Sequence, residues 1–271
     1  MPAIQLARLK IQAAQLAEHF TDPPAFGRAL GNLLDDYADH VRRAGQSGTP
    51  PPLLPAYHVP PPVLRQVMKE LTPRAIALPE AALLLCDRLW SEPKLEFRLL
   101  AASLLGCVPP QPPRRIFEKV ESWVEPEVED RLLRALASSA LTRARQEFSE
   151  VFSSQLEIWL SAPTLSVQRL GLLALLPLVN DASFGNIPLL YRWLTPLTRA
   201  VPLPLREDLV EVLRALAQRS PRETVHFFQQ VLSMPDNPDT AWLIRKTMTV
   251  LPKQWQTSLH EALKEAAARK R

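Results

Sequence analysis

Short apolar runs separated by proline recur along most of this 271-residue sequence. In the clearest case, residues 79–106, a proline lies near the start of each of two apolar runs. Proline is tolerated in the first turn of a helix, because the N–H that it lacks would have no intrahelical partner there. The segment therefore predicts two helices, about 79–90 and 92–107, joined by a tight corner, with Ser91 as the N-cap of the second.

The second of these helices is apolar over a wide arc. Leu95, Leu99 and Ala102 fall on one face at helical spacing, and Leu100 and Leu104 lie beside them. We expect Leu99 and Ala102 to lie between neighbouring helices. One such pair cannot bury its apolar surface alone and needs similar pairs stacked on either side. The pattern therefore predicts an all-α fold of the α-solenoid type.

The same alternation continues along the chain, and pairing the runs gives a period of about 40 residues, within the range of HEAT repeats. Only seven glycines are present, which favours helices over a sheet protein with many tight turns. Helices are predicted at about 2–20, 24–44, 61–71, 79–90, 92–107, 113–124, 126–140, 143–160, 164–178, 184–199, 204–218, 221–233, 238–250 and 252–269.

Residues 47–60 form the one long stretch without helical periodicity, and their prolines favour an extended conformation. We interpret it as a linker that packs along the repeats, with Leu53, Leu54 and Tyr57 touching the core; binding to a proline-recognising partner is the alternative. The predicted organisation is an N-terminal helical hairpin at 1–46, the linker, and a HEAT-like repeat domain at 61–271. Together they are expected to form one structural unit.

The charge balance is mildly basic, with a formal net charge of +4, which permits nucleic-acid binding without indicating it. Cys86 and Cys107 both fall in apolar runs, so we expect two buried thiols rather than a disulfide framework. The five histidines are scattered and none has a metal-like spacing. We therefore predict no metal site and no cofactor.

The sequence also contains no apolar run of about 18 residues, the length that would suggest a membrane span. Polar residues interrupt the N-terminal region where a signal peptide would need an apolar core. We expect a cytoplasmic protein that makes no membrane contact and is a monomer.

Residues 89–98, Leu-Trp-Ser-Glu-Pro-Lys-Leu-Glu-Phe-Arg, resemble the Leu-Trp-x-x-Pro-x-x-Glu-Phe element of the AlkD-like DNA alkylation repair family. The resemblance continues weakly from about residue 59 to residue 252. It implies one curved, right-handed solenoid of HEAT-like repeats. It also implies duplex DNA as the ligand and hydrolytic removal of alkylated purines, without a cofactor, as the activity.

The acidic run 121–130 lies where that family carries Trp-Trp-Asp-x-x-Asp. In the family the Trp pair faces DNA, and the last Asp stabilises the cationic sugar that forms as the base leaves. Here Trp123 matches the first Trp and valine replaces the second. The position of the last Asp falls on Val128 if there is no gap, and on Glu129 or Asp130 if the turn is longer. The resemblance implies that Trp123 contacts DNA and, with the longer turn, that Glu129 or Asp130 is the catalytic carboxylate. The alternative is an ordinary acidic helix start, because carboxylates favour a helix N-terminus.

Two further segments extend the resemblance to basic residues. Arg169 lies in a Gln-Arg-Leu run that matches a family helix whose Arg contacts the DNA backbone. Arg214 lies in a Val-Leu-Arg run, but Glu211 stands where the family has a Trp beside the lesion. With Arg206 and Arg115, these arginines are the predicted phosphate contacts, since Arg pairs bidentately with phosphate. Solvated helix faces also carry Arg by default, which is the alternative.

The residues therefore leave two functions open. The first is a duplex-DNA-binding relative of the alkylpurine glycosylases, with a concave basic face and with excision activity if the altered Trp and Asp set still supports it. The second is a non-catalytic HEAT-like scaffold that binds another protein. The DNA function requires Trp123, a carboxylate and Arg169 to converge on one concave face.

Overall fold

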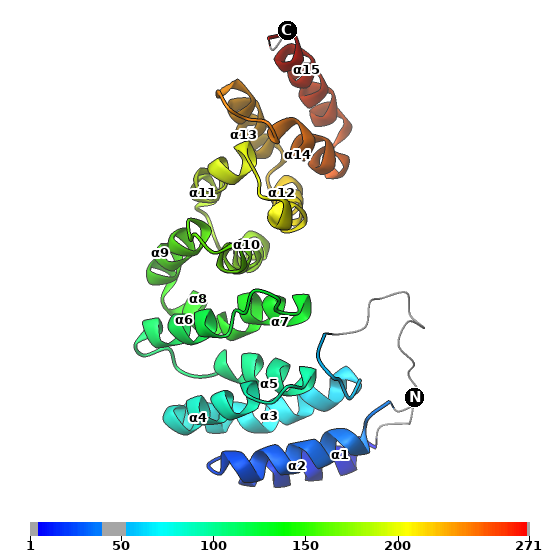
Figure 1. Cartoon of the computed structure of the whole chain (residues 1–271), viewed down its shortest axis with the longest axis vertical. Coiled ribbons are helices and arrows are strands. Elements are labelled where there is room, and N and C mark those ends of the chain that lie inside the picture. The colour runs from blue at the N-terminus through cyan, green and yellow to red at the C-terminus, as the bar shows by residue number, and fades with distance from the viewer. Residues whose placement is uncertain (1–4, 40–52, 270–271) are drawn as a thin grey trace. The chain divides into compact units, whose positions relative to one another are not determined.

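The computed structural model describes residues 5–39 and 53–269, and within these residues the secondary structure is entirely helical (Figure 1). The α-helices in chain order are α1 Leu6–Glu18, α2 Pro23–Asp36, α3 Pro61–Ala77, α4 Pro79–Trp90, α5 Leu95–Leu105, α6 Pro113–Ser122, α7 Asp130–Ala135, α8 Thr142–Glu147, α9 Ser149–Leu160, α10 Leu165–Asn180, α11 Ile187–Arg199, α12 Arg206–Arg219, α13 Pro221–Ser233, α14 Thr240–Thr247 and α15 Lys253–Arg269. A π-helical turn, η1 (Leu136–Ala140), follows α7. A 3₁₀ turn, η2 (Leu203–Leu205), precedes α12, and another, η3 (Met248–Val250), follows α14.

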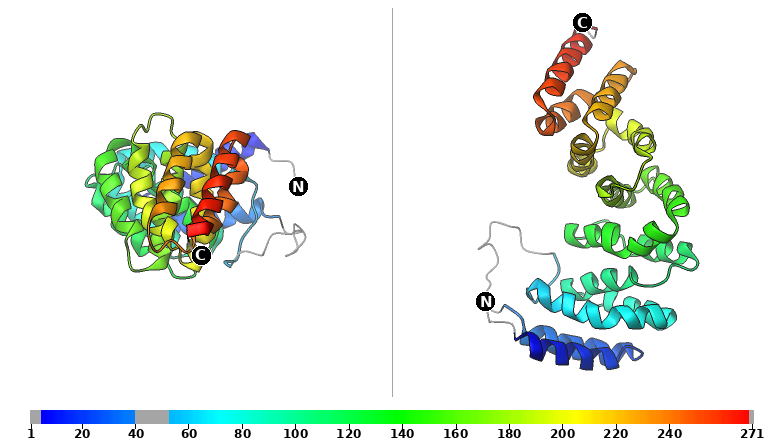
Figure 2. Two further views of the ribbon diagram at one scale, coloured as in Figure 1. Left: turned by 90° about the horizontal axis from the view of Figure 1, so that it is seen from above. Right: turned by 180° about the vertical axis from the view of Figure 1, so that it is seen from behind.

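The helices group into two compact units, Met1–Ser153 and Ser154–Arg271, with the division inside α9. In unit 1, α1, α3, α5 and α7 pack in succession, and α2 packs on α4. In unit 2, α10, α12 and α14 form one layer, while α11, α13 and α15 form the other (Figures 1 and 2). Successive helix pairs thus cover each other's apolar faces within each unit, and the predicted all-α solenoid is confirmed.

Helix α5 shows how this core is built. Leu95, Leu100 and Leu104 are buried, and α5 packs against α3, α4 and α7. Leu99, expected between helices, is only half-buried, whereas its neighbour Leu100 is 1 % exposed. Ala102, the other residue expected there, is buried, with 0 % exposed, so the prediction is confirmed for Ala102 and wrong for Leu99. A helix that is apolar over a wide arc does not itself reveal where the buried face ends.

The corner before α5 also differs from the prediction. The helix begins at Leu95, three residues later than expected, and no side chain caps it. Ser91 is instead the last residue of the preceding turn, with α-helical backbone angles, and its hydroxyl donates to the carbonyl of Arg88 at 2.8 Å. The Ser91 hydroxyl therefore bonds to the last turn of α4 and does not cap α5.

Helix α3 continues to Ala77, although its predicted end was at Leu71, just before Pro73. Buried side chains recur every fourth residue across the proline: Val63, Val67, Leu71 and Ala75. Their packing maintains the helix although Pro73 offers no N–H to its hydrogen-bond ladder.

Several other predicted helices are shorter or divided; the one placed at 126–140, for example, begins at Asp130. The one placed at 24–44 ends at Asp36, and its last five predicted residues lie outside the described part of the chain. The one placed at 143–160 is divided at Phe148, whose backbone angles, φ −135° and ψ 54°, are not helical.

The described part of the linker, residues 53–60, is held against unit 1 by a buried carboxylate. Glu96, 5 % exposed, accepts hydrogen bonds from the main-chain N–H groups of Tyr57 (3.0 Å) and His58 (2.8 Å). The N–H of Leu95 donates to the carbonyl of Pro55 at 3.0 Å. The Tyr57 ring stacks on Phe97 with 6.5 Å between centroids. The segment packs on α5 through Tyr57 as expected, but Leu53, which was also expected to touch the core, is 70 % exposed. The predicted limit at residues 46 and 47 lies outside the described residues.

The two thiols differ in environment and should differ in reactivity. Cys86 is fully buried in α4, and this burial raises the pKa of its thiol well above the usual range. Cys107, which was expected to be buried, is partly exposed, with its sulfur 3.5 Å from the carbonyl oxygen of Ser103. A thiol reagent at mildly alkaline pH should therefore label Cys107 quickly and Cys86 only after unfolding, because the thiolate is the reactive species.

A reagent that releases one chromophore for each thiol it modifies measures this difference, when the number of reactive thiols is compared in native and in urea-unfolded protein. The control is Cys107→Ser, which should leave the native protein almost unreactive. Rapid labelling of native Cys107→Ser would contradict the buried position of Cys86.

Candidate nucleic-acid interface

A groove of about 720 Å³ lies on the α10, α12 and α14 layer of unit 2. Its charged and aromatic lining comes from α12 and α14: Glu207, Glu211, Arg214, Trp242 and Lys246. Leu176 and Asn180 of α10 close one side. Because three successive helices of one layer contribute to it, the groove runs across the repeats rather than along one helix.

Trp242 is the aromatic residue of this groove, and the sequence analysis did not single it out. Its ring is half-buried, with the guanidinium carbon of Arg206 5.1 Å and the Lys246 Nζ 5.9 Å from the ring centroid. Both separations are within the range of cation–π attraction. The available signal was the Trp242–Lys246 spacing of one helical turn, which places both side chains on one face of α14.

The predicted contact Arg214 lies in the same groove. Its Nε donates to the main-chain carbonyl of Lys246 at 3.0 Å, which leaves its two terminal nitrogens without a partner among residues 5–39 and 53–269. Glu207 and Glu211 place two carboxylates in the same lining. The groove thus combines two cations with two carboxylates.

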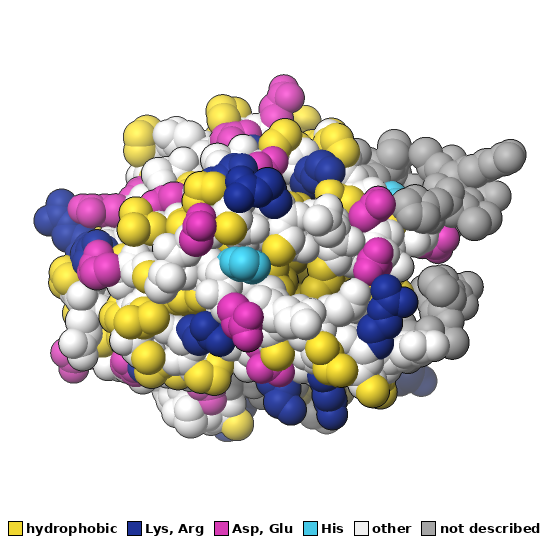
Figure 3. Space-filling model, turned by 90° about the horizontal axis from the view of Figure 1, so that it is seen from below, with side chains coloured by type: hydrophobic (Ala, Val, Ile, Leu, Met, Phe, Trp, Pro, Cys, Tyr) yellow, Lys and Arg dark blue, Asp and Glu magenta, His cyan; other side chains and the backbone are white. Residues whose placement is uncertain are grey.

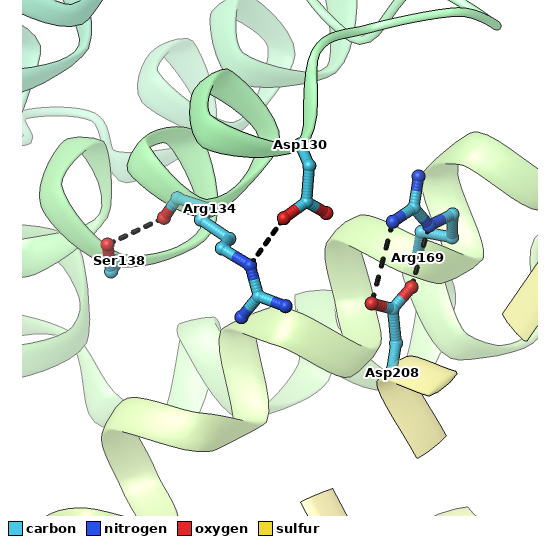
Figure 4. Close-up of polar contacts among 5 residues, drawn as sticks. All are labelled: Asp130, Arg134, Ser138, Arg169 and Asp208. Atoms are coloured by element: carbon cyan, nitrogen blue, oxygen red, sulfur yellow. Dashed lines mark hydrogen bonds and ion pairs between the residues drawn. The ribbon is translucent and has the colours of Figure 1, made fainter. Parts of the chain in front are cut away.

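Two other predicted arginines of unit 2 are held by carboxylates. The Arg169 Nε lies 2.6 Å from Oδ2 of Asp208, a buried residue of α12, so the pair joins α10 to α12 (Figure 4). Arg206 donates to Asp239 Oδ1 at 2.9 Å and links α12 to the start of α14. Both arginines therefore connect successive repeats, and phosphate contacts by them stay predictions.

Arg115, in unit 1, is also paired. Its two terminal nitrogens lie 2.7 and 3.0 Å from the carboxylate oxygens of Glu80. These hydrogen bonds hold the pKa of Glu80 below its usual range. A cavity of about 390 Å³ beside this pair is also lined by Asp87, Glu118 and Lys119, so its charges are mixed. A DNA contact by Arg115 stays a prediction.

The two candidate carboxylates differ in accessibility. Asp130 is the first residue of α7, its side chain is 53 % exposed, and its Oδ2 lies 2.7 Å from the Arg134 Nε (Figure 4). Glu129 is 9 % exposed, and its Oε2 has no hydrogen-bond partner among the residues that the structure describes. Asp130 is therefore the carboxylate that a ligand can reach from solvent.

Trp123 has a packing role that its sequence context did not indicate. Its indole stacks on Trp90 with 4.4 Å between centroids and 6° between planes, and it is 6 % exposed. Arg98 lies over Trp90 at 5.2 Å, and Lys119 lies near the Trp123 ring at 5.8 Å. A DNA contact by Trp123 stays a prediction. So does its convergence with Arg169, which belongs to the other unit.

The N-terminal end of unit 1 carries mixed charge. Figure 3 shows acidic, basic and hydrophobic side chains interspersed over this face. Arg8 of α1 pairs with Asp36 of α2 at 3.3 Å. Among the described residues of this end, charges of both signs are therefore mixed, as they are in the unit 2 groove.

Neither a metal-ion cluster nor a membrane-spanning helix occurs among the residues that the structure describes. Outside the undescribed residues 1–4, 40–52 and 270–271, no group of three or more His, Cys, Asp or Glu could hold a metal ion. In the same part of the chain, no helix has the length and apolar character to cross a membrane.

Comparison with known proteins relates the sequence to a repair family. A family model described as DNA alkylation repair enzyme matches residues 30–265. The match includes every candidate residue described above. The comparison with curated proteins found no match, and the comparison with solved structures found none either.

Proposed function

Because the chain belongs to the DNA alkylation repair enzyme family, we propose that it binds double-stranded DNA through the groove on α10, α12 and α14. The observation that carries the proposal is the clustering of Arg214, Lys246 and the half-buried Trp242 in one groove. Arg and Lys supply the phosphate contacts that dominate affinity for DNA, and an indole offers a flat surface beside the backbone.

The carboxylates of Glu207 and Glu211 define the expected strength of this binding. They repel phosphate locally and offset part of the positive charge of the groove. Arg169 and Arg206 are engaged with Asp208 and Asp239, so they add less than free arginines would. We therefore propose modest, strongly salt-dependent affinity that rests mainly on Arg214 and Lys246.

We further propose that the protein excises alkylated purines slowly, with Asp130 as the carboxylate. An alkylated purine carries positive charge and leaves readily, so the main requirement is an anion that stabilises the cationic sugar. The bond between sugar and base breaks first, and its electron pair leaves with the base and neutralises the base's positive charge. Water then adds to the cationic sugar and releases a proton to solvent, so no cofactor is needed. Asp130 is exposed enough to act in this way, although its pairing with Arg134 reduces its field.

A protein scaffold is the second candidate function. The observation in its favour is that Arg115, Arg169 and Arg206 already pair with carboxylates of neighbouring helices. Pairs of this kind stiffen the repeats without requiring a nucleic acid. The titration below separates the two candidates.

Removing either free cation of the groove should weaken DNA binding and its salt dependence. For Arg214→Ala or Lys246→Ala, the slope of log affinity against log salt should fall by about one, because one fewer phosphate is neutralised. Anisotropy titrations with a labelled short duplex over a series of salt concentrations measure both quantities.

Lys264→Ala is the matched control, since Lys264 is an exposed lysine on α15 and does not line the groove. It should leave both the affinity and the slope unchanged. A parent protein that does not bind duplex at low salt, or equal slopes in all variants, would support the scaffold instead.

A further inference from the structure

Unit 2 contains a second cavity, of about 740 Å³, on the layer formed by α11, α13 and α15. The DNA groove lies on the other layer, so the proposed function does not use this cavity. Its volume is within the range of about 300–1,000 Å³ that is typical of small-molecule sites.

Aromatic rings form the floor of this α13 cavity. Tyr191 of α11 and Phe227 of α13 are buried and lie 4.8 Å apart between ring centroids. The Tyr191 hydroxyl is 2.8 Å from Thr224 Oγ1, and burial raises the pKa of the phenol to about 12. The phenol is therefore neutral at physiological pH and does not repel an anion. Trp255 of α15 adds a half-buried indole to the lining.

Two arginines line the same cavity. Arg192 comes from α11 and Arg222 from α13, and both are exposed. Neither forms a hydrogen bond or ion pair with any other residue in the described ranges. They differ in this respect from Arg115, Arg169 and Arg206, which carboxylates hold in place. Unpaired guanidinium groups are suited to bidentate contact with a carboxylate or phosphate.

The outer face of α13 adds hydrogen-bonding groups between these cations. His226 and Gln229 follow Arg222 at spacings of four and seven, so they share one face of the helix. Gln229 donates to the hydroxyl of Ser258 on α15 at 3.1 Å. Glu223 is the one acidic residue of the lining, so the two arginines outnumber it.

We propose that the α13 cavity binds a small organic anion that carries a planar ring. The ring lies against the aromatic floor near Trp255, and the carboxylate or phosphate pairs with Arg192 and Arg222. A nucleoside monophosphate and an aryl carboxylate share this chemistry and serve as the two probes.

Isothermal titration calorimetry with four probes tests each part of the proposal. Adenosine 5′-monophosphate and benzoate carry both a ring and an anion, whereas inorganic phosphate and adenosine each lack one of them. At least one of the first two should bind at least about tenfold more tightly than either of the last two, since one charged hydrogen bond is worth about that much. Binding of only one of the first two identifies the source of the anion.

The double variant Arg192→Ala/Arg222→Ala should weaken binding of that probe by at least about tenfold. The matched control, Arg245→Ala/Lys264→Ala, removes two exposed cations that do not line the cavity and should bind like the parent. Trp255→Phe should weaken the ring probes but not inorganic phosphate. Equal thermal melting of parent and variants shows that the fold is kept.

Two outcomes overturn the proposal: no heat with either ring-bearing anion, or equal binding by the parent and the double arginine variant. The site is independent of the DNA groove, so Arg214→Ala should leave probe binding unchanged. A parent protein that binds the probe but not DNA would refute the proposed DNA function and leave the cavity proposal intact. A parent protein that binds DNA but neither ring-bearing anion would refute only the proposal for the α13 cavity.

Discussion

Replacing Leu100 by aspartate should abolish cooperative folding of unit 1. Leu100 is 1 % exposed in α5, at the centre of the packing against α3, α4 and α7. An unpaired carboxylate at such a position costs at least several kcal/mol, which is comparable to the whole stability of a domain. Urea unfolding followed by circular dichroism measures the loss.

Leu84→Asp is the matched control for this substitution. Leu84 lies on the neighbouring helix α4, but 64 % of it is exposed, so a carboxylate there stays hydrated. The control should unfold at nearly the same urea concentration as the parent. If Leu100→Asp also did so, α5 would have to be removed from the core of unit 1.

Replacing Asp130 by asparagine should lower the rate of alkylpurine release on the order of a hundredfold, if the proposed excision occurs. The loss is of the size found when one preorganised electrostatic contact with a transition state is removed. The measurement is single-turnover base release from duplex that contains N7-methylguanine.

Glu129→Gln is the matched control, because it also converts a carboxylate to an amide at the next position. Glu129 is buried, so the release rate should stay near that of the parent. Its Oε2 has no partner in the described structure, so loss of the charge should leave the fold at least as stable. Equal rates in the parent and Asp130→Asn would remove Asp130 from the mechanism, and a large loss in Glu129→Gln alone would assign the role to Glu129.

The helical fold could be predicted because proline and apolar periodicity are local signals. Helix α4 occupies the predicted residues 79–90, and α13 the predicted residues 221–233. Pro73 misled the prediction because packing on four buried side chains outweighs the loss of one hydrogen bond. Ser91 misled it because a hydroxyl that can cap the next helix can equally bond to the previous one.

The candidate site could be predicted only in part. Arg214 was found from its motif. The spacing between Trp242 and Lys246 is a local signal, but the contact of Trp242 with Arg206, which lies 36 residues earlier and on another helix, is not. The pairing of Arg169 with Asp208 spans a similar distance of 39 residues. Such contacts depend on which faces of neighbouring repeats meet, and the sequence contains no local signal for that.

The clamp formed by Glu96 affects where the chain can be shortened. A truncation that began at Pro61 would keep every helix from α3 onward, and by helix boundaries alone it would look complete. It would nevertheless remove both N–H groups that bind the Glu96 carboxylate. An anion would then remain in a site that is 5 % exposed, with its hydrogen bonds lost. The non-helical residues that include Tyr57 and His58 are thus as much a part of the folding unit as the helices that follow them.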